Sequence, residues 1–212
     1  MRAFHNDPAI KEKYLARVRA HAAADEIVKG KYWENGKGCA VGCTIHSDSH
    51  IAYEDELEIP VHLARLEDQI FEGLSNQLSK TWPIRFLEAI DPGADLSKVW
   101  PKIAIWILSD EEFGVLQYNN DPAILKVIKL YHRVLDGIEL ARIAAFTNAA
   151  RAAAYAASAA YASAASADAY AYAYGCSALN VVAAAAYASH IFYITLSDKL
   201  VQTLREANNG IT

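Results

Sequence analysis

Four side chains of types that bind zinc, Cys39, Cys43, His46 and His50, lie within one short segment of the 212-residue chain. Their spacings of 4, 3 and 4 residues place all four on one face of a continuous helix. Such a helix separates the first from the last by about 16 Å, whereas the ligands of one zinc ion lie within about 4 Å of each other. A zinc site here therefore requires the chain to turn, and we expect the turn at residues 47–49.

Nearby residues at helical spacing could complete such a site. His21 precedes Asp25 by four residues, and His50 precedes Glu54 by four, so each pair would meet on one side of a helix. The alternative is that these cysteines and histidines are hydrogen-bonded packing groups, which is the commoner role of such clusters.

The same segment could instead supply a thiolate nucleophile. A cysteine at a helix N-terminus has a lowered pKa, and a histidine base can complete the pair. An enzyme of this kind would use Cys39 with His46, or with another histidine such as His62 or His132. The segment does not match the papain-like cysteine signature, however, and two buried cysteines that pack as apolar groups are the simpler interpretation.

The third interpretation is a turn whose backbone N–H groups hold an anionic or nucleotide-like ligand. The glycines around Cys39 match neither the dinucleotide fingerprint nor the phosphate loop, but a lysine and a tryptophan lie beside them. The expected ligand-binding residues are Trp33, Lys37, Gly38, Cys39 and Gly42. An ordinary loop between two helices would explain the same residues.

Helices position this segment in the predicted fold. Several prolines stand where a first helical turn tolerates them, and most follow an acidic or polar stretch. The predicted helices begin near Pro8, Pro60, Pro83 and Pro122, and the first of them ends near Gly30. A further helix covers Asp95 to Leu108, with Pro101 either kinking it or marking its start. Strand signals are nearly absent, so we expect an all-α helical bundle.

The chain becomes alanine-rich from residue 141 to residue 189, where 25 of 49 residues are alanine. Alanine favours helix, and small residues let two helices approach closely. We expect a long Ala/Tyr-rich C-terminal helical hairpin with its break at residues 175–177. The same helices could also form an oligomer interface. The expected organisation is a region of residues 1–119 and a long-helix region of residues 120–212, packed as one unit.

Composition excludes several classes of protein. The formal net charge is −5, with no run of lysine or arginine, so nucleic acid is not an expected partner. The N-terminus lacks the apolar core of a secretory signal, and the alanine tract is too polar for a membrane span. We expect a cytoplasmic protein whose three cysteines are thiols, with a small molecule or a protein as its partner.

Two stretches, GKGCAVGCTIHS with the downstream Tyr53-Glu54 and IPVHLARLEDQIFEGL, resemble segments of an uncharacterised group of bacterial and bacteriophage proteins. The resemblance covers about residues 30–100 and brings no activity with it. It implies that Cys39, Cys43, His46 and His50 belong to one unit. A phage setting would admit a role in conflict with a host, such as the sequestration of a ligand.

The leading functional hypothesis is a non-enzymatic helical protein in which residues 30–50 form a small-molecule site. This segment combines glycine, cysteine, histidine and aromatic residues without a complete catalytic set. The alternatives are a metal- or thiol-dependent enzyme that uses the Cys/His cluster, with zinc as the cofactor to consider, and a structural protein that forms oligomers through its alanine-rich helices.

Overall fold

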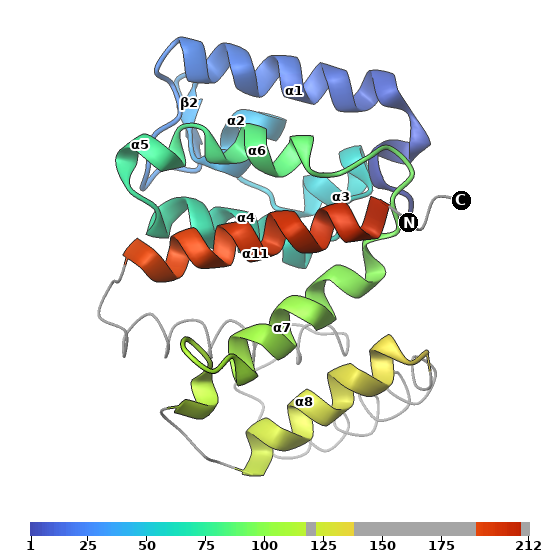
Figure 1. The fold of residues 1–212 in the computed structure, drawn as a ribbon. Coiled ribbons are helices and arrows are strands. Elements are labelled where there is room, and N and C mark those ends of the chain that lie inside the picture. Colours follow the sequence, from blue (N-terminus) through green and yellow to red (C-terminus); the bar gives the residue numbers. More distant parts are fainter. Residues whose placement is uncertain (118–121, 138–189, 209–212) are drawn as a thin grey trace, which may run out of the picture. The chain divides into compact units, whose positions relative to one another are not determined.

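The computed structural model describes residues 1–117, 122–137 and 190–208, and within them helices dominate, which confirms the all-α prediction (Figure 1). A two-stranded hairpin accompanies the helices. In chain order the elements are η1 (Ala3–Asn6), α1 (Pro8–Ala23), β1 (Trp33–Glu34), β2 (Lys37–Gly38), α2 (Ala40–Ile45), α3 (Ile51–Leu57), α4 (Val61–Gly73), α5 (Asn76–Ser79), α6 (Trp82–Glu88), η2 (Leu96–Lys98), α7 (Val99–Ser109), η3 (Val115–Gln117), α8 (Pro122–Leu135) and α11 (His190–Asn208). The predicted alanine-rich hairpin lies outside the described residues.

The chain forms two compact units, one of Met1–Ile103 with Ala188–Thr212 and one of Ala104–Tyr187. The expected boundary between residues 119 and 120 stays a prediction. In the first unit, α11, far along the sequence, lies beside α4 (Figure 1). Gly73 permits this approach, because a Cβ atom there would lie 2.2 Å from the Tyr193 ring.

Among the described helices, none is both long and apolar enough to cross a membrane.

Proline positions set several helix starts as predicted. α1 begins at Pro8, and the Asp7 side chain accepts a hydrogen bond of 2.8 Å from the Ala9 N–H, which caps the helix. α4 begins just after Pro60, and α8 begins at Pro122. Pro101 lies in the first turn of α7, so it marks a helix start rather than a kink.

The first helix ends earlier than expected, at Ala23 instead of near Gly30. Asp25 adopts a left-handed conformation with φ of 56°, which stops the helix. The chain then runs beside Gly38: the Val28 N–H donates to the Gly38 carbonyl at 2.8 Å, and the Gly38 N–H donates to the Glu26 carbonyl at 3.1 Å. Residues 26–28 are thus strand-like, and the middle one, Ile27, is buried.

An Asn-Gly turn joins the two short strands, a hairpin signal that the sequence reading missed. Trp33 pairs with Gly38 and Glu34 pairs with Lys37, while Asn35 and Gly36 both have positive φ, as a type I′ turn requires. The segment is therefore a hairpin and not a free loop.

The hairpin approaches α2 with almost no space between them. A Cβ atom at Gly42 on α2 would lie 1.6 Å from the Tyr32 carbonyl oxygen, and within the hairpin segment one at Gly38 would lie 2.1 Å from the same oxygen. Only glycine fits at either position. These two glycines therefore serve backbone packing.

A carboxyl group lies inside the core of the first unit. Glu67 on α4 is fully buried, and its Oε2 accepts a hydrogen bond of 2.6 Å from the Tyr53 hydroxyl on α3. Burial raises the pKa of Glu67 well above its usual range, and the neighbouring Asp68 acts in the same direction. The Trp82 indole N–H donates to the Glu67 backbone carbonyl at 2.9 Å. The hydrogen bond from Tyr53 lowers that pKa, so burial is the dominant cause of its rise.

Candidate functional site

The chain turns after α2, as the sequence predicts. α2 ends at Ile45, His46 adopts a left-handed conformation with φ of 54°, and α3 begins at Ile51. The turn does not gather the four expected metal ligands. Cys39 and Cys43 are buried and His46 is exposed, while His50 lies beside Asp68, which also neighbours Cys39. Within residues 1–117, 122–137 and 190–208, no three His, Cys, Asp or Glu side chains are placed to hold a metal ion.

Cys39 and Cys43 are buried thiols. The Cys43 thiol donates a hydrogen bond to the Gly38 carbonyl oxygen 3.3 Å away, and burial raises its pKa to about 12. Burial also raises the pKa of Cys39, with the Asp68 carboxylate acting in the same direction. Because nucleophilic attack needs the thiolate, the raised pKa values of Cys39 and Cys43 disfavour either one as a nucleophile at neutral pH.

These pKa shifts predict slow alkylation of both thiols in the folded protein. A Cys176→Ser variant leaves only Cys39 and Cys43. We expect iodoacetamide at neutral pH to modify them at least about 1000-fold more slowly in the native state than in denaturant, because a pKa near 12 leaves little thiolate. Mass spectrometry of timed samples gives the two rates. Equal rates would contradict the buried-thiol assignment.

The backbone donors expected to hold a ligand are already in use. The Gly38 N–H donates to the Glu26 carbonyl, and the Cys39 N–H donates to the Lys31 carbonyl at 2.7 Å. Gly38, Cys39 and Gly42 are all buried. Of the five expected ligand-binding residues, the structure therefore leaves only Trp33 and Lys37 accessible, and these two lie on the hairpin.

His50 lies in a different neighbourhood from His46. Its Nε2 is 3.5 Å from an Asp68 carboxylate oxygen, and its ring contacts Tyr32 edge-on, with ring centroids 5.6 Å apart. The expected helical partner, Glu54, instead accepts a hydrogen bond of 3.1 Å from the Val61 N–H at the start of α4. Glu54 therefore caps a helix and does not support a ligand.

His46 meets a histidine from α1. The Nε2 atoms of His46 and His21 are 2.7 Å apart, and Nδ1 of His21 is 2.6 Å from a Glu26 carboxylate oxygen. Trp33 stacks on the His46 ring, with centroids 4.4 Å and planes 11° apart. We refer to His21, Glu26, Trp33 and His46 as the histidine cluster.

Four segments position the histidine cluster, and the one that carries Glu26 runs between α1 and the hairpin. His21 lies in the last turn of α1, Trp33 is the first residue of the hairpin, and His46 follows α2, where its left-handed backbone ends the helix. The expected partner of His21, Asp25, turns away to pair with Lys80, because α1 has already ended at Ala23. Glu26 takes the place of Asp25 beside His21.

The hydrogen-bonding roles within the histidine cluster follow from the chemistry of imidazole. Because the Glu26 carboxylate accepts from Nδ1–H of His21, a neutral His21 offers the lone pair of Nε2, and Nε2–H of His46 donates to it. Partial burial lowers the pKa of His46, and Arg17 and His21 lower it further, while the carboxylates of Glu56 and Glu26 oppose them.

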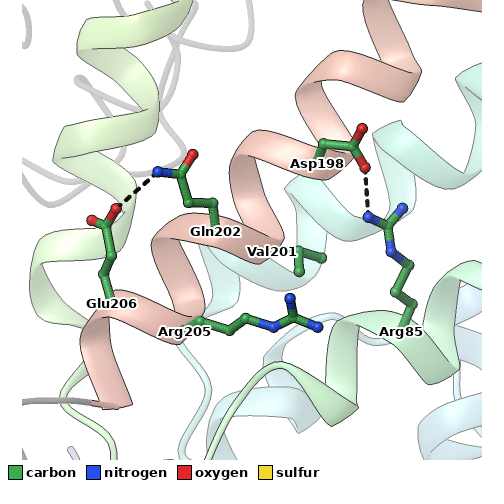
Figure 2. Close-up of a pocket in the computed structure, with 6 residues that line it drawn as sticks. All are labelled: Arg85, Asp198, Val201, Gln202, Arg205 and Glu206. Atoms are coloured by element: carbon green, nitrogen blue, oxygen red, sulfur yellow. Dashed lines mark hydrogen bonds and ion pairs between the residues drawn. The ribbon is translucent and has the colours of Figure 1, made fainter.

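A hollow of about 500 Å³ lies elsewhere on the first unit, between α6 and α11 (Figure 2). Asp198 accepts a hydrogen bond of 2.5 Å from Arg85, and Gln202 donates one of 3.2 Å to Glu206. Its lining is Arg85, Asp198, Val201, Gln202, Arg205 and Glu206. Arg85 and Asp198 pair with each other, and Glu206 pairs with Lys102 outside the lining. The hollow includes none of the residues expected to bind a ligand.

No family model matches the chain, and no curated protein and no solved structure is significantly similar to it. The resemblance to bacterial and bacteriophage proteins stays a prediction.

Proposed function

We propose that the protein is a non-enzymatic binding protein and that the histidine cluster is its binding site. The observation that supports this proposal is the 2.7 Å approach of two imidazole nitrogens from separate segments at an accessible surface. Polar groups that converge from separate segments are typical of binding sites. The proposed site keeps Trp33 and His46 from the predicted segment and adds His21 and Glu26.

A small ligand suits the chemistry of the histidine cluster. Between them, the two facing Nε2 atoms carry one N–H group and one lone pair, so a ligand can replace their mutual hydrogen bond. The Trp33 indole provides a flat wall beside His46. The Glu26 carboxylate and the Arg17 guanidinium supply charges of opposite sign, and Arg17 is fixed by a hydrogen bond of 2.8 Å to the Thr44 carbonyl.

The geometry supports binding more than catalysis. The cysteine proposed as a nucleophile, Cys39, is a buried thiol, and the histidine proposed as its base, His46, forms its hydrogen bond with His21 instead. An assembly role for residues 141–189 lies outside the described part of the chain. Ligand sequestration in conflict with a host is compatible with a binding site and stays a prediction.

Imidazole nitrogen NMR tests the proposed site. Zinc chloride, inorganic phosphate and AMP are added separately to the ¹⁵N-labelled full chain. We expect at least one of these probes to shift the ring nitrogen signals of His21 and His46 together. The shifts should saturate, because the two rings share one hydrogen bond and a ligand that breaks it changes both. His5 and His132 serve as internal references, since they lie outside the histidine cluster.

A Trp33→Leu variant provides the matched test of the wall beside His46. We expect it to weaken binding of the probe that shifts His21 and His46 several-fold while the chain stays folded by circular dichroism, because the stacking partner of His46 is lost. The proposal is wrong if none of the three probes shifts the His21 and His46 signals, or if the shifts centre on other histidines.

A further inference from the structure

We propose that His21 and His46 together bind one divalent transition-metal ion, such as Zn²⁺ or Ni²⁺, through their Nε2 atoms. This inference rests on the proposed function and names the ligand class of the same site. It uses only one of the four residues that spacing suggested, His46, and takes its second ligand from α1. The supporting observation is that two imidazole Nε2 atoms face each other across 2.7 Å.

The separation of the two nitrogens is close to the one that a metal ion requires. Zinc–nitrogen bonds of about 2.0–2.1 Å in a tetrahedral arrangement place two ligand nitrogens about 3.3 Å apart. The two nitrogens need to separate by about 0.6 Å. The rings now point straight at each other, with centroids 5.0 Å apart, so each ring must also tilt until its lone pair points at the ion. His46 lies at the exposed C-terminal end of α2, so its ring has room for this movement.

Glu26 prepares His21 for this role. Its carboxylate lies 2.6 Å from Nδ1 of His21, which holds that proton on Nδ1 and leaves the lone pair on Nε2. A carboxylate behind a ligating histidine is the usual support of a metal-binding imidazole. His46 needs only to carry its ring proton on Nδ1 instead of Nε2, so both rings remain neutral when the ion binds.

The remaining coordination positions would be open to water or to a further solute. Among the described residues no third protein ligand is available, and the nearby Cys43 thiol is already hydrogen-bonded to the Gly38 carbonyl. Two imidazoles favour zinc, nickel and copper over magnesium or calcium. The site would therefore bind its ion exchangeably, and more weakly than a four-ligand structural zinc site.

Calorimetric titration of the untagged, EDTA-treated full chain with zinc chloride and with nickel chloride tests this inference. We expect one ion per chain, with His21→Ala and His46→Ala each weakening binding at least tenfold. Glu26→Gln should weaken it by about 10–100-fold, because the support of His21 is lost. His50→Ala and Cys176→Ser are the matched controls and should leave the affinity unchanged. Magnesium should not bind.

The outcomes separate this inference from the proposed function. If zinc and nickel leave the His21 and His46 nitrogen signals unchanged while phosphate or AMP shifts them, the metal inference fails and the binding site stands. If no probe shifts them, both fail. Metal binding that survives in both histidine variants, or that is lost in His50→Ala, also overturns the inference. If either histidine variant misfolds, the Glu26→Gln variant, which keeps both ligands, still tests the inference.

Discussion

Replacing Gly42 by alanine is expected to lower the free energy of unfolding by about 3 kcal/mol, with urea denaturation as the measurement. The added Cβ atom would lie 1.6 Å from the Tyr32 carbonyl oxygen, which is backbone and cannot turn aside. At an ordinary position within a helix the same substitution stabilises a protein by about 1 kcal/mol, so the expected sign is opposite. The hairpin would have to move away from α2, and Trp33 would move with it.

Gly36 provides the control for this prediction. It has φ of 81° and no atom within 4 Å of an added Cβ, so Gly36→Ala meets backbone strain without a steric clash. We expect a loss of roughly 1 kcal/mol there, reduced in Gly36→Asn because asparagine tolerates the left-handed region. Equal losses at Gly36 and Gly42 would contradict the close contact between the hairpin and α2.

The second large expected effect is a pH dependence of the free energy of unfolding that arises from Glu67. The folded chain holds the Glu67 proton more tightly than the unfolded chain does, because burial raises the pKa of the carboxyl group well above its usual range. The stability that this group contributes is complete below a pH of about 4.5 and is lost as the pH rises toward the folded-state pKa. The free energy of unfolding should therefore fall by up to about 1.4 kcal/mol per pH unit over that window.

A Glu67→Gln variant removes this titration and keeps the shape of the side chain. The difference in unfolding free energy, variant minus parent, should grow as the pH rises from 4.5 to 7. In this range the folded parent must either bury a charge at Glu67 or keep a proton that the unfolded chain releases, and the variant has no such cost. Chemical denaturation at several pH values measures it. Parallel curves for the two proteins would show that Glu67 is ionised in the folded state. The Tyr53 hydroxyl, Asp68 and the Trp82 indole are the polar groups around it.

Much of the helical fold could be predicted because its signals are local. Pro8 and Pro122 each begin a helix where the sequence placed one, and Asp7 caps α1 through its own neighbouring backbone. The turn after α2 was predicted from ligand geometry and is present, although it serves a different purpose. The early end of α1 was not predicted, since it depends on the left-handed Asp25 and on pairing of the following residues with Gly38.

The histidine cluster could be predicted only in part. The Asn35-Gly36 pair was a readable hairpin signal, and it would have removed the expectation of a flexible ligand loop. The contact between His21 and His46 joins residues 25 positions apart, and no local spacing determines it. The helical pairing of His21 with Asp25 failed because periodicity holds only while the helix continues. The burial of both cysteines likewise depends on how the hairpin packs on α2.

His46 occupies a helix end where its backbone conformation favours glycine or asparagine over any branched or ring-bearing residue. A histidine there carries a conformational cost of roughly 1–2 kcal/mol that glycine would avoid. Screens that select variants for heat resistance alone would therefore enrich glycine at this position and discard half of the imidazole pair. If the proposed site is right, selection for thermostability and selection for ligand binding would favour different residues at position 46.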